Sequence, residues 1–296
     1  MKRWIAPVVA ALLAPALVTA PATAAPRTAP DPVKALKHQL RPGHGVRVTE
    51  ITTVPLKQKG KPTAKMIARV GGSLEFGPAG VAATDLTTRF TTQPPPKKKD
   101  EDLSSTERRI TLRGKTYSSG PPVWMDKLPE GKRWVRTENV LKAIGSGTYQ
   151  LYVNVFDPGT LRFLVREADR RLPGASGVQY TGVNTRKELY WASSAYRRGW
   201  DFPPGDEWAQ RKITWRLWLD GRGLPSRLAT EADIDIARDT TVRMATDSRY
   251  TGWGSRVVIT APPADQVVDF NDLDDIDDIF EPESPLNIIV ERAKND

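Results

Sequence analysis

The chain has 296 residues, a formal net charge of +9 and no cysteine. Without cysteine it can form neither a disulfide nor a thiol-linked lipid anchor, so its stability must come from a hydrophobic core. Its 39% of hydrophobic residues and nine tryptophans are typical of a folded globular protein and exclude a largely disordered one.

Residues 1–24 have the pattern of a secretory signal peptide. The basic pair Lys2-Arg3 precedes an uncharged run over residues 4–20, and Ala22-Thr23-Ala24 supplies small residues for cleavage after Ala24. The alternative is a membrane anchor, but the run is short, contains prolines and lacks a following cluster of charges. No later stretch reaches the roughly 20 apolar residues of a spanning helix, so we expect a secreted, extracytoplasmic protein of the cell envelope without a transmembrane segment.

Charge is unevenly distributed along the chain. The segment from Asp265 to Asp296 holds eleven acidic and two basic residues, which leaves the preceding part strongly basic. A basic body favours anionic partners such as phospholipid headgroups, teichoic acids or acidic glycans. Nucleic acid is not expected, because the chain is exported and carries no recognition motif. The alternative is that the charge serves solubility alone.

The first predicted element is a short helix. Asp31-Pro32 provides an N-cap and a proline at the first helical position, and Val33, Leu36 and Leu40 recur at helical spacing. Pro42-Gly43 ends the run.

Antiparallel strands are predicted from Gly45 to Phe90. Polar and apolar residues alternate there, and Gly71-Gly72 and Gly77–Gly80 are interpreted as turns. Residues 92–105 are rich in proline and charge, so we expect an exposed loop within one domain; the alternative is a linker between two domains.

The next residues continue the strand pattern. Arg109–Tyr117 is predicted as one strand, Leu128–Gly131 as a turn and Lys132–Thr137 as the returning strand.

The strongest helix signal follows Asp157-Pro158, which repeats the combination of cap and proline. Its predicted apolar stripe, which should lie on the sheet, consists of Leu161, Leu164, Val165, Ala168 and Leu172.

A hairpin is predicted beyond this helix. Alternate residues of Ile213–Leu219 point to one face, and Asp220–Gly223 turns the chain toward Arg227–Ala229. Val257–Ile259 is predicted as a late strand, after which residues 271–296 form an acidic tail.

No catalytic or metal-binding motif stands out. His38 and His44 are the only histidines, and no G-x-S-x-G motif accompanies them, so a hydrolase is disfavoured and no enzyme activity or cofactor is expected. A zinc site would need ligands that the chain lacks. The acidic tail contains calcium-type oxygen ligands but not the spacing of an EF-hand loop, which favours a solvated tail over a calcium site.

Several segments together carry a family resemblance: Gly114–Tyr117, Leu128–Val135, the helix opening at Asp157-Pro158, and Trp218–Leu228. In this order of elements the chain resembles the LolA-like superfamily, and more narrowly the actinobacterial LppX/LprG-type envelope proteins. The resemblance covers roughly residues 31–270. It implies an α+β fold in which helices cover the concave face of a strongly curved antiparallel sheet, an unclosed barrel, with a hydrophobic cavity between the two layers. Many of those relatives are anchored through an N-terminal cysteine, which is missing here.

We therefore predict a signal peptide at 1–24, a single LolA-like domain at 25–270 and an acidic tail at 271–296. The predicted function is that of a non-enzymatic carrier that binds a lipid or acyl chain. The alternative is an envelope sensor or interaction module that binds a protein partner or the anionic cell wall. The residues predicted to line the cavity are Trp134, Leu161, Leu164, Val165, Trp215 and Leu217.

Overall fold

The computed structural model describes residues 30–56, 64–95, 104–120, 128–138, 153–194, 197, 206–237 and 240–273. The α-helices are α1 (Pro32–Gln39), α2 (Pro158–Arg166), α3 (Arg186–Ala192) and α5 (Asp206–Ala209). The first six strands are β1 (His44–Leu56), β2 (Ala64–Gly77), β3 (Gly80–Gln93), β4 (Ser105–Leu112), β5 (Lys115–Ser119) and β6 (Trp134–Glu138). The others are β7 (Arg170–Gly174), β8 (Gly177–Thr185), β9 (Lys212–Asp220), β10 (Pro225–Ala237), β11 (Thr240–Arg256) and β12 (Val267–Asp269). Two short 3-10 helices, η3 (Ala264–Gln266) and η4 (Phe270–Asp272), flank β12.

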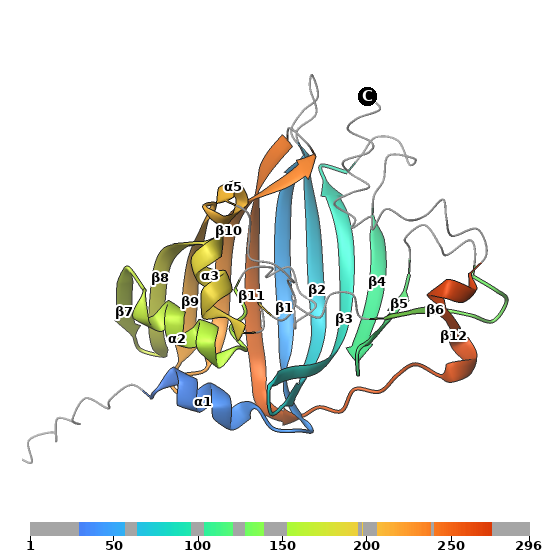
Figure 1. The fold of residues 1–296 in the computed structure, drawn as a ribbon, viewed down its shortest axis with the longest axis horizontal. Helices are drawn as coiled ribbons and strands as arrows, with labels where there is room; N and C mark the ends of the chain where they lie inside the picture. Colours follow the sequence, from blue (N-terminus) through green and yellow to red (C-terminus); the bar gives the residue numbers. More distant parts are fainter. Residues whose placement is uncertain are drawn as a thin grey trace, which may run out of the picture.

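All twelve strands belong to one sheet, in the order β12-β6-β5-β4-β3-β2-β1-β11-β10-β9-β8-β7. Neighbouring strands are antiparallel except β12 and β6, which are parallel. The two end strands, β12 and β7, do not pair with each other, so the sheet is unclosed (Figure 1). The predicted fold class, an α+β protein with a large unclosed antiparallel sheet and helices on one face, is confirmed.

Three helices cover the half of the sheet that ends in β7. Figure 1 shows α2 and α3 in front of this half and α1 along its lower end. The Asp31 side chain caps α1 by accepting hydrogen bonds from the Val33 and Lys34 backbone N–H groups. Asp157 caps α2 in the same manner, as predicted, and accepts from the Gly159 N–H.

Residue alternation separates the two faces of the sheet. On β9, residues 213, 215, 217 and 219 are buried under the helices, whereas Thr214 and Arg216 are exposed on the other face. The buried side chains join Leu36 of α1 and Leu189 of α3 in the main hydrophobic core. The helix-covered face is therefore mostly apolar over β8 to β10, and the opposite face of β9 is open to solvent.

A second cluster lies at the other half of the sheet and on its other face. It contains Ile110, Tyr117 and Trp134, with Ile259 and Val267 packed against them. The chain after β11 thus covers apolar residues that would otherwise be exposed on the helix-free face.

Three predicted turns or strands differ from the structure. Gly71-Gly72 is not a turn but lies inside β2. The Asp85 carbonyl oxygen lies only 2.0 Å from where a Cβ of Gly72 would be, so this position of the strand requires a glycine. Arg109–Tyr117 is not one strand: a turn at Arg113-Gly114, where both residues have positive φ, separates β4 from β5. Val257–Ile259 is not a strand, and the Ile259 N–H donates to the Glu75 carboxylate.

The second helix is shorter than predicted. It ends at Arg166, and Leu172, placed on its stripe by the spacing, lies on β7 and is 52% exposed. Helix α3 was missed, although Thr185 and Glu188 form a capping box at its start. Most of the proline-rich segment at 92–105 and of the tail at 271–296 lies outside the described residues, and β3 extends to Gln93.

Gly182 of β8 makes room for the Trp215 ring, since a Cβ there would lie 2.5 Å from Cζ2 of the indole. We expect Gly182→Ala to lower the free energy of unfolding by about 1–3 kcal/mol through overpacking. Gly71→Ala is the matched control, because a Cβ at Gly71 meets no atom within 4 Å. Urea unfolding of both variants measures the difference, and equal stability of the two would contradict this packing.

Candidate functional site

Five of the six predicted cavity residues meet in one place. Leu161 and Leu164 of α2 and Trp215 and Leu217 of β9 belong to the main core, and Val165 packs against it half-buried. The Trp215 indole N–H also donates to Asn184 Oδ1 at 2.8 Å, which fixes the orientation of the ring.

Trp134, the sixth residue, lies elsewhere. It begins β6 and points to the helix-free face, where it packs with Ile110 and Tyr117. The Arg108 guanidinium carbon lies 5.6 Å from its ring centroid. Because β6 is nine strands away from β8 in the sheet order, the structure does not bring Trp134 together with the α2 stripe.

The assembled cluster is closed. Leu161, Leu164, Trp215 and Leu217 are each 0% exposed. A side chain that lines an empty or water-filled cavity keeps accessible surface, so these four line no open cavity in this conformation. An acyl chain can reach them only if the helix layer moves away from the sheet.

A buried polar cluster lies beside the apolar one on the same face. Glu50 is 1% exposed and accepts a hydrogen bond of 2.6 Å from the Ser248 hydroxyl. Next to it, the Thr52 and Thr246 hydroxyls lie 3.1 Å apart. Burial, together with the negative charge of Glu50, raises the pKa of Tyr250.

Sequence reasoning missed this polar cluster, although a signal was present. Glu50 is in phase with Val46 and Val48, which the alternation of β1 places inside. A carboxylate at an inward position needs hydrogen-bonding partners, and the register supplies Ser248 directly opposite on β11.

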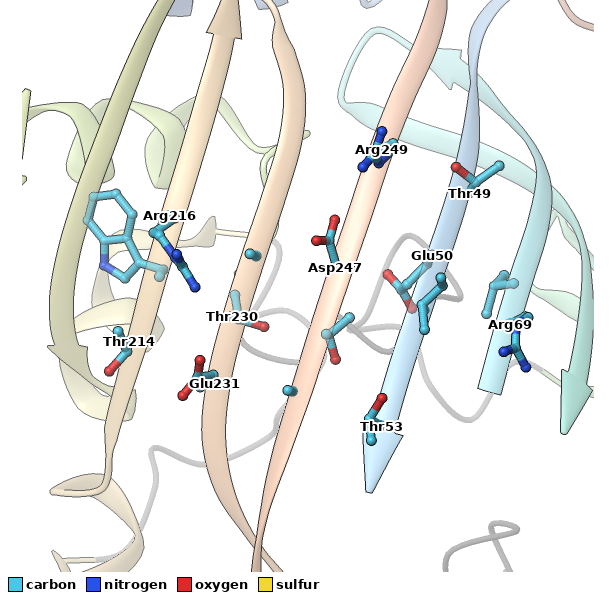
Figure 2. A pocket seen from close by; sticks show the side chains of 16 residues that line it. Thr49, Glu50, Thr53, Arg69, Thr214, Arg216, Thr230, Glu231, Asp247 and Arg249 are labelled. Carbon is cyan, nitrogen blue, oxygen red and sulfur yellow. The ribbon is translucent and has the colours of Figure 1, made fainter. Parts of the chain in front are cut away.

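The opposite face of the sheet holds an open groove of about 640 Å³. It crosses β9, β10, β11, β1 and β2, and Figure 2 shows Arg216 and Arg69 at its two sides with Arg249 between them. The side chains that point into it come from the outward positions of these strands. They are Thr49, Ile51, Thr53, Arg69, Thr214, Arg216, Ala229, Glu231, Ala245, Asp247 and Arg249.

Asp247 in the lining of the groove forms an ion pair with Arg227, which is not itself a lining residue. The Arg227 guanidinium donates through Nε to Asp247 at 3.0 Å and a second time through Nη2, and this pairing raises the pKa of Arg227. The guanidinium carbon also lies 4.5 Å from the Trp218 ring centroid. Asp247 is therefore neutralised by Arg227.

No group of three or more potential metal-ligating side chains occurs among the described residues. His44 begins β1, and its Nδ1 lies 3.0 Å from the Pro42 carbonyl oxygen. No helix in the described part of the chain is long and apolar enough to span a membrane.

No protein-family model and no curated protein matches the chain. Among the solved structures that are similar to it, three share 8–10% sequence identity with it. A LolA superfamily protein from Nitrosomonas europaea covers 77% of this chain and 93% of its own, at a TM-score of 0.25. A hypothetical protein from Chlamydia trachomatis covers 77% and 97% at 0.23, and a DUF1329 family protein from Desulfovibrio piger covers 78% and 95% at 0.21. At these values the function has to be inferred from the residues of this chain.

The buried hydroxyl pair Thr52–Thr246 allows a double-mutant test of the polar cluster. We expect Thr52→Val and Thr246→Val each to lower the free energy of unfolding by about 1–2 kcal/mol, because each leaves the other hydroxyl without its partner. The double variant should cost less than the sum of the two. Thr53→Val, on the outward face of the same strand, is the control with an effect near zero. Additive losses in urea unfolding would show that the two hydroxyls do not interact.

Proposed function

We propose that the protein is an exported, non-enzymatic carrier of the LppX/LprG type, which holds the acyl chain of a lipid or a lipoprotein anchor between its helix layer and its sheet. Its basic body would work next to an anionic envelope surface. The site would be formed by the α2 stripe and the inward face of β9.

The observation that carries this proposal is the nature of the contact between α2 and the sheet. Helix α2 has nine residues, and a helix of that length is not stable in water by itself. Burial of Leu161 and Leu164 therefore holds it in place, at about 1.5–3 kcal/mol for each side chain. An acyl chain offers the same kind of apolar surface and can replace these contacts when α2 moves.

The neighbouring polar cluster suits an amphiphile. The register places Leu217 of β9, Leu228 of β10, and Ser248 of β11 in one cross-strand row, with Glu50 next to Ser248. This row changes from apolar to polar across four strands. The apolar end can pack on an acyl chain while the polar end hydrogen-bonds its ester or amide linkage.

Native mass spectrometry of the protein purified from its secreting host, followed by organic extraction, tests this function. We expect a lipid in stoichiometric amount. Val165→Asp places a charge at the half-buried edge of the stripe and should abolish lipid binding, because an uncompensated carboxylate is not tolerated against an acyl chain.

Ile51→Asp is the matched control, since Ile51 is 49% exposed on the opposite face of the sheet. It should retain the lipid. Far-ultraviolet circular dichroism verifies that both variants are folded. A lipid-free mass together with no uptake from an envelope lipid extract would rule out the carrier.

A further inference from the structure

The helix-free face of the sheet carries a set of exposed arginines that the acyl-chain proposal does not use. They are Arg47, Arg69, Arg89, Arg170, Arg216 and Arg249. None of them forms an ion pair with any residue in the described part of the chain.

Other arginines of the same face are neutralised by aspartates. Arg108 and Arg243 each donate two hydrogen bonds to an aspartate, Asp85 and Asp233 respectively. Arg227 is paired as well, with Asp247 of the groove lining. The positive charge that remains for a ligand is therefore concentrated on the unpaired arginines.

The sheet register arranges these arginines across the strands. Arg216 of β9 and Arg69 of β2 lie in the same cross-strand row, which passes through Ala229, Asp247 and Ile51. Strands are about 4.8 Å apart, so the two arginine backbones are separated by about 19 Å.

This line of arginines extends beyond the groove at both ends. On one side, Arg170 of β7 continues the row past Arg216 through Thr181 of β8. Arg89 of β3 continues the row directly after Arg69. Arg249 of β11 lies opposite Thr49, one outward position along the strands from the row. The result is a series of cations that runs perpendicular to the strands, over the floor of the groove shown in Figure 2.

The rest of the lining suits hydroxyl groups. Thr49, Thr53 and Thr214 point into the groove, where each can donate or accept a hydrogen bond. The exposed carboxylate of Glu231 can accept from a hydroxyl but repels an anion, so the anionic groups of a ligand are directed to the arginines.

We propose that this groove binds a linear phosphate-bearing polymer, a chain of polyol units joined by phosphates, which lies across the strands from Arg216 to Arg69. The planar guanidinium group matches phosphate oxygens in two-point hydrogen bonds, and the polyol hydroxyls meet the threonines and Glu231. A groove of about 640 Å³ accommodates a few repeats of such a chain, whereas a flat bilayer cannot enter a hollow. The proposal does not depend on acyl-chain binding at the other face.

Binding of fluorescent synthetic poly(glycerol phosphate) to the full chain, followed by anisotropy, tests the proposal. The variant Arg69→Gln/Arg216→Gln/Arg249→Gln should lose affinity by about tenfold or more, which corresponds to about 1.4 kcal/mol for each factor of ten. The affinity of the unaltered protein should fall as salt is raised, because the contacts are exposed ion pairs.

The control variant Arg113→Gln/Arg162→Gln/Lys187→Gln removes the same charge from exposed positions away from the groove. Its affinity should lie within about twofold of that of the unaltered protein, since it loses only part of the long-range electrostatic attraction between the protein and the polymer. Arg243→Gln, on the same strand as Arg249 but at a paired arginine, should also bind normally. Thermal unfolding verifies the fold of all variants.

Four results would overturn the proposal. The first is an equal loss of affinity in the two triple variants, and the second is binding of polygalacturonate as tight as that of poly(glycerol phosphate). The third is preferential binding of anionic phospholipid vesicles through the same arginines, and the fourth is binding of poly(glycerol phosphate) only by a chain truncated after Leu273. The second would assign a general polyanion site and the third a membrane-docking face. The fourth would make the acidic segment 274–296 the occupant of the groove.

Discussion

Leu161 and Leu164 of α2 belong to the same buried core as Trp215 and Leu217 of β9, and this core joins the helix layer to the sheet. All four are fully buried. The helices that supply this layer are short, so their own hydrogen bonds contribute little net stability in water. The position of the layer, and whether the sheet below it is reachable, depends on this apolar contact.

Successive side chains of a strand point to opposite faces of the sheet, so the two faces of this unclosed sheet can differ in chemistry. Inward positions of β9 to β1 change from apolar to polar within one row, from Leu217 to Glu50. Outward positions of the same strands carry arginine, threonine and a few carboxylates. A substitution on one face therefore leaves the other face largely intact, which allows the two binding proposals to be tested separately.

Much of the fold could be predicted from the sequence because its strongest signals are local. The Asp-Pro pairs at 31–32 and 157–158, each an N-cap followed by a proline, start helices where expected. The alternation in Ile213–Leu219 gives the correct face of β9. The elements that were wrong depend on partners distant in sequence. Gly71-Gly72 has the composition of a turn, but the close approach of β3 requires a residue without a side chain at Gly72.

The sites were less accessible to sequence reasoning than the fold. The stripe of α2 and the inward face of β9 could be predicted separately, and the structure brings them together. Trp134 was predicted to line the same cavity but lies with Ile110 and Tyr117 on the other face, because a five-residue strand gives too little alternation to fix its phase. The groove arginines come from three strands that are far apart in the chain, so only the sheet register aligns them.

The most direct measurement of the central claim is native-state hydrogen exchange, resolved for the amides of α2 and for those of β1 and β11. If α2 is a cover that leaves the sheet while the sheet stays folded, its amides will exchange with a much lower opening free energy than those of the central strands. Added acyl ligand will then change the exchange of α2 and leave that of the central strands unchanged. Exchange of α2 only through global unfolding, at the same free energy as β1 and β11, would contradict a helix layer that opens to admit a ligand.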